Sequence, residues 1–336
     1  MSFDRENPLA QKMRDGEFVI TVEYDVPSRE QPLESALAVG KQLAQSIAQH
    51  DETAALAITD RLRTEETHDT ADSLAALRDA SAKPPVLHIA GKGMIAENLR
   101  AQEAAADSCG VRTLFCCSGN RYRLHETKKG EGRVRHSETG YMESVRMLRL
   151  LSGEKQSFLL GAAVNPFKYT TADTYLQYFK MICKLESGAD FFVAQAGWDM
   201  KKLQELQWYM QSRDIDAPVI ARLMLLSFDD IEHIDEKLYP GMNISRPFAA
   251  QLQRESTINA TQSLAAQLQR LALQAAGCRL MGFSGVQLAG VRDSRTLEMV
   301  LSKIAEACDA YADYASWTAA WKEFHNNIIF NPVPDP

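Results

Sequence analysis

The sequence lacks the features that mark several large classes of protein. None of its six cysteines, at positions 109, 116, 117, 183, 278 and 308, has the C-x-x-C spacing of a zinc site or the regular spacing of a disulfide framework. No hydrophobic run approaches the roughly 20 residues of a membrane helix. Residues 1–16 are charged and contain no apolar signal core. We therefore expect reduced, mostly buried cysteines, no metal site, no membrane partner and a cytoplasmic protein.

Positive charge is also scarce. The chain of 336 residues has 37 Lys and Arg against 44 Asp and Glu, which gives a formal net charge of −7. The nearest approach to a basic run, residues 128–135, contains two glycines and is typical of a polar loop. Because nucleic-acid binding needs a basic patch, we expect no nucleic-acid partner and a small-molecule substrate instead.

Eight short runs rich in apolar and β-branched residues alternate with longer segments of helical spacing. This alternation is typical of βα units and a parallel sheet. Eight parallel strands closed by a last helix, residues 294–311, leave no sheet edge exposed, so we predict an α/β fold in which residues 1–336 form one (β/α)8 TIM barrel. The predicted strands are residues 18–24, 55–59, 85–90, 111–118, 158–164, 189–195, 218–223 and 280–286.

The helical segments show apolar faces that could cover such a sheet. Leu176, Phe179 and Cys183 fall on one face, and we expect that face to point inward. Two connections are long, residues 120–141 and 227–277. The chain should begin with a short polar segment and end in a loose Pro-rich tail, residues 330–336. We also expect the barrel to form a homo-oligomer.

The residues that end the strands of such a barrel converge on one mouth, where active sites of this fold lie. Glu23 is unusual among them, because it occupies an inward position that alternation would give to an apolar side chain. Burial would raise its pKa toward the range of a general acid. The alternative is that Glu23 pairs with a buried Arg222. The candidate mouth residues are Glu23, Thr59, His88, Gly119, Asn120, Asn165, Gln195, Arg222 and Gln287.

Residues 91–96, GKGMIA, follow a predicted strand and match the dinucleotide-binding pattern G-x-G-x-x-A. That pattern requires an acidic residue at the end of the next strand to hold a ribose. The next strand ends in Cys116, Cys117 and Ser118 and supplies no acid. A plain βα turn is therefore the favoured interpretation.

Several segments occur in an order that resembles one known family. They are Val22-Glu23, Ile58-Thr59-Asp60, Ser118-Gly119-Asn120, residues 161–167 (GAAVNPF), residues 184–195 (KLESGADFFVAQ) and residues 239–244 (YPGMNI). Together they resemble methylenetetrahydrofolate reductases over about residues 18–286. The GAAVNPF stretch is similar to the divergent branch found in acetogenic bacteria.

This resemblance implies a barrel that holds a flavin, FAD or alternatively FMN, with NADH or NADPH as co-substrate. Hydride passes between the flavin and the one-carbon unit that distinguishes 5,10-methylenetetrahydrofolate from 5-methyltetrahydrofolate. Glu23 matches the family's acid, which protonates folate N10, and Gln195 and Gln287 are the further expected substrate contacts. The expected flavin contacts are Thr59, His88, Ser118, Gly119, Asn120, Ala162, Asn165 and Lys184, the last of these beside a phosphate.

Asn120 departs from the family pattern, in which the residue after Gly119 is an aspartate. A neutral amide does not oppose the anionic reduced flavin, so the flavin should be easier to reduce. We therefore expect catalysis, in which Asn120 and Glu23 take part, to be biased toward oxidation of 5-methyltetrahydrofolate. The strand at residues 283–288 also lacks the arginine that grips folate in the common branch.

Two other functions remain open from the sequence. One is a folate-binding paralogue without redox activity, which acts as a carrier or as a subunit in methyl transfer. The other is a NAD-dependent enzyme without flavin, which would use residues 91–96.

Overall fold

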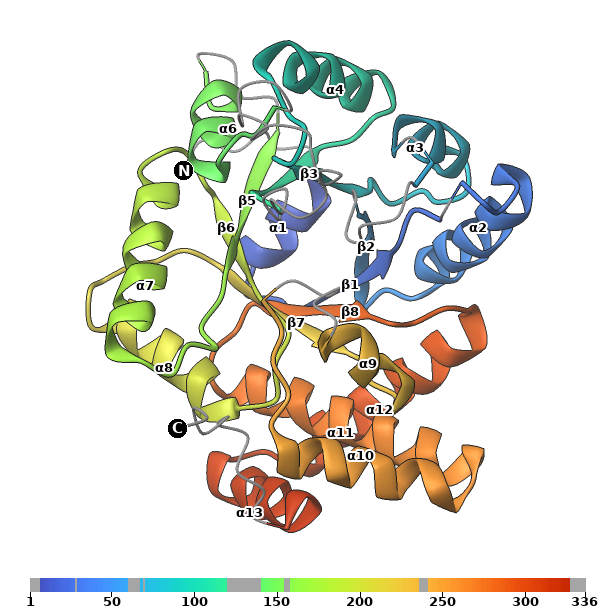
Figure 1. The fold of residues 1–336 in the computed structure, drawn as a ribbon, viewed down its shortest axis with the longest axis vertical. Helices are drawn as coiled ribbons and strands as arrows, with labels where there is room; N and C mark the ends of the chain where they lie inside the picture. The colour runs from blue at the N-terminus through green and yellow to red at the C-terminus, as the bar shows by residue number, and fades with distance from the viewer. Residues whose placement is uncertain are drawn as a thin grey trace, which may run out of the picture.

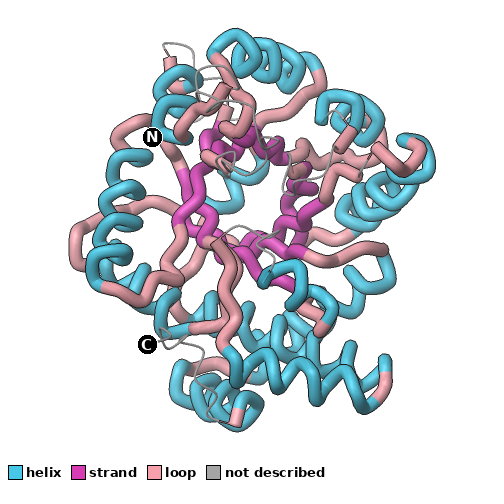
Figure 2. Tube along the Cα trace, in the orientation of Figure 1, coloured by secondary structure: helices cyan, strands magenta, loops and turns pink. Residues whose placement is uncertain are grey.

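Eight parallel strands pair in chain order, and the eighth pairs with the first, so the sheet closes on itself (Figures 1 and 2). The computed structural model describes residues 7–27, 29–59, 67–68, 70–119, 140–153, 158–235 and 241–326. The predicted (β/α)8 barrel is thereby confirmed. The strands are β1 Val19–Tyr24, β2 Thr53–Ile58, β3 Val86–Ala90, β4 Thr113–Cys117, β5 Leu159–Val164, β6 Phe191–Ala194, β7 Val219–Met224 and β8 Gly285–Ala289.

Helices surround the strands as an outer ring (Figure 2). Alternate strand residues face these helices and form the main core with them, while the residues between face the barrel interior. The helices are α1 Pro8–Arg14, α2 Leu33–Gln49, α3 Thr70–Arg78, α4 Ala96–Ser108, α6 Ser144–Leu151, α7 Thr171–Leu185, α8 Met200–Gln211, α9 Asp229–Asp235, α10 Arg246–Ile258, α11 Ala260–Leu280, α12 Ser294–Ala310 and α13 Tyr314–His325.

The last strand lies later in the chain than the sequence suggested. Helix α11 continues to Leu280, so the predicted strand at residues 280–286 overlaps a helix end and the turn that follows it. Leu280, Met281 and Phe283 are apolar and so resemble a strand start, but they form the end of α11 and the turn after it, and only residues 285 and 286 of the predicted strand lie in β8. Strand β8 begins at Gly285, where a Cβ atom would lie 2.1 Å from the carbonyl oxygen of Val19. A glycine is therefore required where β8 meets β1 to close the barrel.

Helix α7 corrects a second expectation. Leu176 and Phe179 do share a face, but both side chains are exposed. The inward face of α7 instead carries Tyr178 and Met181, which are buried against the barrel. Apolar periodicity thus identified the helix correctly but assigned its covered face to the wrong side.

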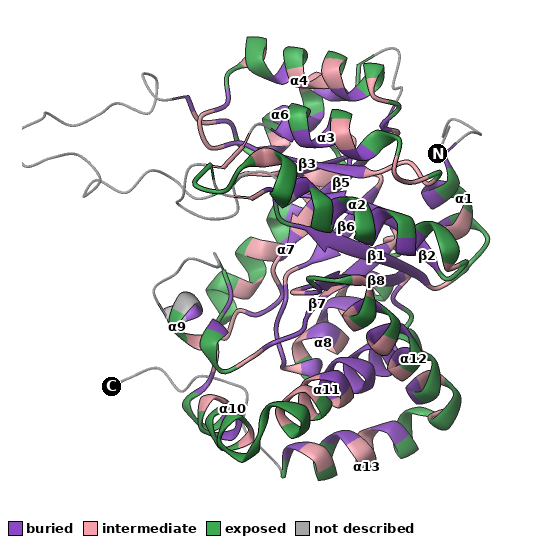
Figure 3. Cartoon of the chain, turned by 90° about the vertical axis from the view of Figure 1, so that its right-hand side faces the viewer, coloured by how far each residue is buried: buried purple, intermediate pink, exposed green. Residues whose placement is uncertain are grey.

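The N-terminal segment is more than a polar leader. Within it, α1 buries Leu9, Ala10 and Met13 among residues of the barrel interior. Asn7 caps this helix, and its side chain also donates to the carbonyl of Arg112 (2.8 Å). Figure 3 shows α1 on the opposite side of the barrel from α9, which follows β7. Helix α1 therefore plugs the end of the barrel where the strands begin.

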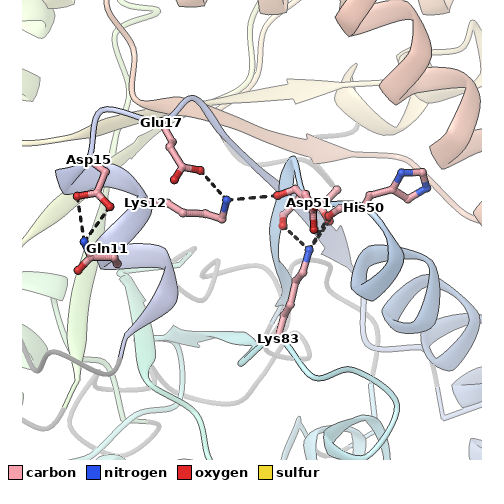
Figure 4. A network of polar contacts seen from close by, with 8 residues as sticks. Gln11, Lys12, Asp15, Glu17, His50, Asp51 and Lys83 are labelled. Atoms are coloured by element: carbon pink, nitrogen blue, oxygen red, sulfur yellow. Dashed lines mark hydrogen bonds and ion pairs between the residues drawn. The ribbon is translucent and has the colours of Figure 1, made fainter.

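Polar contacts tie this plug to neighbouring turns (Figure 4). Lys12 pairs with Glu17 (2.6 Å) and donates to the carbonyl of Asp51 (3.3 Å). Lys83 donates to the carbonyl of His50, at the end of α2. These contacts join α1 to the turn before β2, while the opposite end of the barrel remains the mouth.

The connection between β7 and β8 contains α9, α10 and all of α11, and α13 packs against α11 (Figure 1). Trp317 of α13 is buried, and its indole nitrogen donates to the carbonyl of Leu273 in α11 (2.7 Å). All six cysteines are free thiols, of which Cys116 and Cys278 are buried and the others are partly exposed. Among the described residues, no helix is long and apolar enough to cross a membrane.

Candidate functional site

The mouth of the barrel has two chemically different sides. On the side of β3, β4 and β5, the inward residues at the strand ends are small: Ala90, Cys117 and Ala163. Cys117 and Ala163 are partly exposed and pack against the interior cluster. The inward residues of the opposite side are polar and come from β1, β7, β8 and the end of β6: Glu23, Arg222, Gln287 and Gln195.

Glu23 and Arg222 form a two-pronged ion pair across the barrel. The guanidinium Nε and Nη2 atoms each donate to one carboxylate oxygen of Glu23, both at 2.7 Å. Both side chains are almost inaccessible to water, with exposed fractions of 4% for Glu23 and 10% for Arg222. Such fork-to-fork geometry fixes both side chains in orientation as well as in charge.

The neighbours of Glu23 keep it ionised. Burial alone would raise its pKa, but the charge and hydrogen bonds of Arg222, together with Gln287, hold the pKa below the ordinary carboxyl value. The alternative left open by the sequence, pairing with Arg222, is therefore the one the structure adopts. The expected upward shift of the Glu23 pKa is wrong, because the guanidinium and the Gln287 amide together outweigh the effect of burial.

Two amides complete the polar side. Gln287 of β8 donates to Glu23 Oε1 (2.7 Å). Gln195 accepts from Arg222 Nη1 (3.1 Å) and from the backbone N–H of Ala196 (2.9 Å). The structure thus brings together three of the predicted substrate and catalytic residues, with Arg222 at their centre.

Arg222 also contacts a loop that sequence reasoning did not connect to it. Its Nη1 lies 3.6 Å from the sulfur of Met242, in the segment before α10. The neighbouring Gly241 has φ +76°, and its carbonyl accepts from the side chain of Asn165 (3.0 Å). The only sequence signal for this contact was the stretch 239–244, of which residues 239 and 240 lie outside the described residues.

His88 lies inside the barrel on β3, where its ring packs 4.5 Å from the ring of Phe115. Burial lowers the pKa of His88 to about 4; the charge of Glu23 opposes this shift, and the smaller effect of Arg222 adds to it. The imidazole is therefore neutral at pH 7. Its buried Nε2 has no hydrogen-bond partner among the described residues.

Thr59 and Ser118, both expected to contact a flavin, are engaged with the protein. The Thr59 hydroxyl lies 3.1 Å from Asp25 and 3.3 Å from the carbonyl of Tyr24. The Ser118 hydroxyl donates to Glu143 (2.9 Å) and accepts from the backbone N–H of Ser144 at the start of α6. Both side chains therefore fix the ends of their strands.

Asn165 and Lys184 are also committed to structural contacts. Besides holding Gly241, Asn165 accepts from the backbone N–H of Phe167 (3.1 Å). The Lys184 ammonium donates to the carbonyl of Ala163 (2.5 Å). Burial lowers the pKa of Lys184 to about 8, so it is still mostly protonated at pH 7. The cation thus lies buried beside β5, next to the small side of the mouth.

The remaining expected flavin contacts are Ala162, Gly119 and Asn120. Ala162 is fully buried in the core between sheet and helices, so its side chain points away from the mouth, and alternation places Ala163 inward instead. Gly119 is exposed, with φ +67°, at the end of the described segment. Asn120 lies outside the described residues.

The turn at residues 91–96 does not present its backbone to a ligand. Gly91 N–H donates to the carbonyl of Cys117, Gly93 N–H to that of Gly140, and Met94 N–H to that of Gly91. A dinucleotide-binding turn needs such N–H groups free for the pyrophosphate. The geometry therefore favours the plain turn over a NAD site.

Comparisons with known proteins agree with this architecture. A search of curated proteins finds no match to the chain. Among solved structures, the chain is similar to an uncharacterized protein from Clostridium thermocellum that binds two copies of 5-methyl-5,6,7,8-tetrahydrofolic acid. The two share 15% identity with a TM-score of 0.64, over 90% of this chain and 100% of the other, which shows a common fold.

The family model that matches is that of methylenetetrahydrofolate reductase, over residues 8–287. This range runs from α1 into β8 and so contains the plug and all the described mouth residues. The chain therefore belongs to the methylenetetrahydrofolate reductase family.

Proposed function

We propose that this protein is a flavin-dependent oxidoreductase that interconverts 5,10-methylenetetrahydrofolate and 5-methyltetrahydrofolate, with NADH or NADPH as co-substrate and a bias toward oxidation of the methyl form. The observation that carries the proposal is the ionised Glu23, held by Arg222 and Gln287 at the polar side of the mouth. Family membership and the folate bound by the similar Clostridium thermocellum protein supply the substrate class.

The polar side of the mouth suits a reduced pterin. A pterin carries an edge of alternating donors and acceptors, which amides and a carboxylate can pair with. Gln195 and Gln287 flank the Glu23–Arg222 pair and supply both kinds of group. In this arrangement the pair has no net charge, so a neutral pterin ring can approach without facing an isolated buried ion.

Glu23 has a place in the proton balance of the proposed reaction. When the methyl group of 5-methyltetrahydrofolate loses hydride, the folate becomes an iminium cation at N5, and closure of the five-membered ring then requires N10 to bond to that carbon and to lose its proton. A carboxylate can accept this proton, and its negative charge also stabilises the cation. Arg222 and Gln287 hold Glu23 in the ionised form that accepts this proton, and the same carboxyl group would return it in the reverse reaction.

The residues of the small side fit a flavin ring. Ala90, Cys117 and Ala163 end their strands without large side chains, so a flat ring could lie over β3, β4 and β5. The buried Nε2 of the neutral His88 offers one hydrogen bond toward a ligand from the barrel interior. A bound flavin would supply hydride acceptance and donation. The Lys184 ammonium would provide nearby positive charge for a phosphate.

Half-reaction kinetics test the proposal. Glu23→Gln should slow flavin reduction by 5-methyltetrahydrofolate by about 10²-fold or more, because the base for N10 is lost. Reduction by NADH or NADPH should change little, since that step needs no proton from Glu23. Glu97→Gln, an exposed substitution on α4, serves as the matched control. An equal loss in both half-reactions of Glu23→Gln would show that the residue is structural.

Asn120 offers a separate test of direction. Replacing it by aspartate adds a negative charge beside the proposed flavin, which should lower the midpoint potential and favour reduction of the methylene form. A tenfold change in the ratio of the two half-reaction rates corresponds to a difference of about 1.4 kcal/mol between their activation free energies. An unchanged potential in Asn120→Asp would refute the electrostatic origin of the bias.

A second candidate function is a folate carrier without redox activity. It is favoured by the side chains of Thr59, Asn165 and Lys184, which are expected flavin contacts yet already bond to the protein. Purified protein distinguishes the two. A yellow protein with about one flavin per chain supports the oxidoreductase. A colourless protein that binds 5-methyltetrahydrofolate but takes up neither FAD nor FMN supports the carrier.

A further inference from the structure

Helix α7 carries an apolar seam on its outward face. Ala172, Leu176, Phe179 and Cys183 follow one another at intervals of 4, 3 and 4 residues, which is the spacing of a seam that packs against another helix. The inward side of α7 is occupied separately, by Tyr178 and Met181. Leu176 and Phe179 are 47% and 64% exposed, so this seam is uncovered in the single chain.

A hollow lies beside the seam. It has a volume of about 600 Å³ and lies between α7 and α8, which are neighbours in the outer ring (Figure 1). Five of its twelve lining residues are aromatic, among them Tyr175, Tyr178, Trp208 and Tyr209, and the other seven are polar or charged. Tyr175 and Trp208 are 63% and 61% exposed. One face of the molecule therefore offers both protruding apolar side chains and a partly aromatic hollow that could receive them.

We propose that this face, defined by the outward seam of α7 and the hollow between α7 and α8, is where a second copy of the chain binds in a two-fold symmetric dimer. A two-fold interface uses the same patch on both subunits, so the patch must be complementary to itself. A face that carries both the protrusions and the hollow meets this condition.

Charge supports the same partner. Asp173 and Lys180 are exposed, and they lie seven residues apart along one flank of the seam. If two copies of α7 pack antiparallel about a point between Gln177 and Tyr178, each Leu176 faces Phe179 of the other copy. Each Asp173 then lies within about 3 Å along the helix axis of the other copy's Lys180, which is within reach of the two side chains. A parallel arrangement would place like charges together. Antiparallel pairing therefore satisfies the apolar seam and the flanking charges at once.

The apolar area is of the size that a dimer needs. An aromatic side chain can bury about 150–250 Å², so Tyr175, Phe179 and Trp208 each present on the order of 100–150 Å² at their observed exposure. With Leu176 they supply about half of the roughly 800 Å² that one subunit contributes to a standard interface. The polar rim of the hollow, which includes Lys202 and Arg213, can supply much of the rest.

Molar mass in solution tests the dimer. By light scattering after gel filtration, the full chain should have twice its mass of 37.5 kDa. Phe179→Asp should halve the mass, because it places a charge at the centre of the seam. Ile258→Asp is the matched control, because it puts the same charge at an exposed apolar residue of α10 and should leave the mass unchanged. A wild-type tetramer that Phe179→Asp reduces to a dimer also supports the contact.

Disulfide trapping gives a second readout that does not depend on weakening the interface. Leu176→Cys lies near the proposed two-fold axis, where two Cα atoms should come within about 7 Å, so mild oxidation should link two chains. Ile258→Cys should give no more linked dimer than the wild type. A monomeric wild-type protein at about 100 µM, or an unchanged mass in Phe179→Asp together with no trapping by Leu176→Cys, would overturn the proposal.

Discussion

At the scale of single residues, Glu23 shows how distant parts of a chain set the chemistry of one carboxylate. Its partner Arg222 is 199 residues away in sequence, and Gln287 is 264 residues away. Both reach Glu23 because β1, β7 and β8 are adjacent in the closed sheet. Closure of the barrel therefore brings to Glu23 the partners that stabilise its ionised form in a buried position.

Removing the guanidinium should reverse the effect of pH on stability. In the wild type, the Glu23 pKa is lower in the folded than in the unfolded chain. The stabilisation by the pair is thus complete above the ordinary carboxyl range and lost as pH falls through the lowered pKa. In Arg222→Met, burial dominates and raises the pKa of Glu23. This variant should lose about 3–5 kcal/mol at neutral pH and become more stable as the pH falls.

Chemical denaturation at about pH 5 and about pH 8 measures this reversal. The double variant Glu23→Gln with Arg222→Met contains neither charge and should show no such recovery in acid. If Arg222→Met loses stability in acid just as the wild type does, the pair does not control the ionisation of Glu23.

At the scale of elements, the sequence predicted the kind and order of the strands well, because a two-residue period and β-branched runs are local signals. The sequence-based prediction failed where one local pattern is compatible with two structures. The spacing of the α7 seam predicts a covered face, but spacing alone cannot tell a helix face that covers a sheet from one that is left exposed. The predicted strand at residues 280–286 starts too early because Leu280, Met281 and Phe283 are apolar, although they end α11 and form the turn after it.

The candidate site was less predictable than the elements. Inward positions such as Glu23, Gln195 and Gln287 followed from strand alternation and the family resemblance. The sequence did not predict which polar atoms at the mouth would be hydrogen-bonded within the protein. The partners of Asn165 and Thr59 depend on how loops meet at the mouth. Contacts between loops are set by the three-dimensional fold and leave no periodic pattern in the sequence.

Gly241 provides a test of the loop that covers the polar side of the mouth. A Cβ atom there would lie 2.9 Å from Asn165 Nδ2, so Gly241→Ala should push the loop away from Asn165 and move Met242 off Arg222. The positive φ adds strain of about 1 kcal/mol. We expect the affinity for 5-methyltetrahydrofolate, measured by titration, to fall about tenfold. This corresponds to about 1.4 kcal/mol of binding free energy.

Gly282→Ala is the matched control for this prediction. Gly282 also has a positive φ, of +83°, but a Cβ there would touch nothing within 4 Å. It lies before β8, at the end of the barrel away from the mouth. The control should therefore lose similar stability while its folate affinity stays at the wild-type value. Equal affinities in the two alanine variants would mean that the loop does not shape the site.

At the scale of the whole molecule, the C-terminal helix α13 joins the barrel through buried side chains, among them Trp317. The Trp317 ring packs so closely on α11 that a Cβ at Gly277 would lie 2.3 Å from it. Helix α11 in turn carries Cys278, which is fully buried in the core shared with the strands. This continuity predicts that α13, although it lies beyond the matched residues 8–287, unfolds together with the barrel.

Trp317→Ala should therefore destabilise the whole barrel, by about 3–5 kcal/mol, because it empties a large buried site and leaves the carbonyl of Leu273 without its donor. Labelling of buried thiols along a denaturant gradient, read by mass spectrometry, can follow two distant points at once: Cys116 in β4 and Cys278 in α11. Both should become reactive at one denaturant concentration in the wild type, and both midpoints should fall together in Trp317→Ala. Ile258→Ala changes an exposed side chain, so it should alter the free energy of unfolding by no more than about 0.5 kcal/mol and leave both midpoints nearly unchanged. If Cys278 reacts well before Cys116, then α11 and α13 form a unit that unfolds separately from the strands, and the chain is not one cooperative domain.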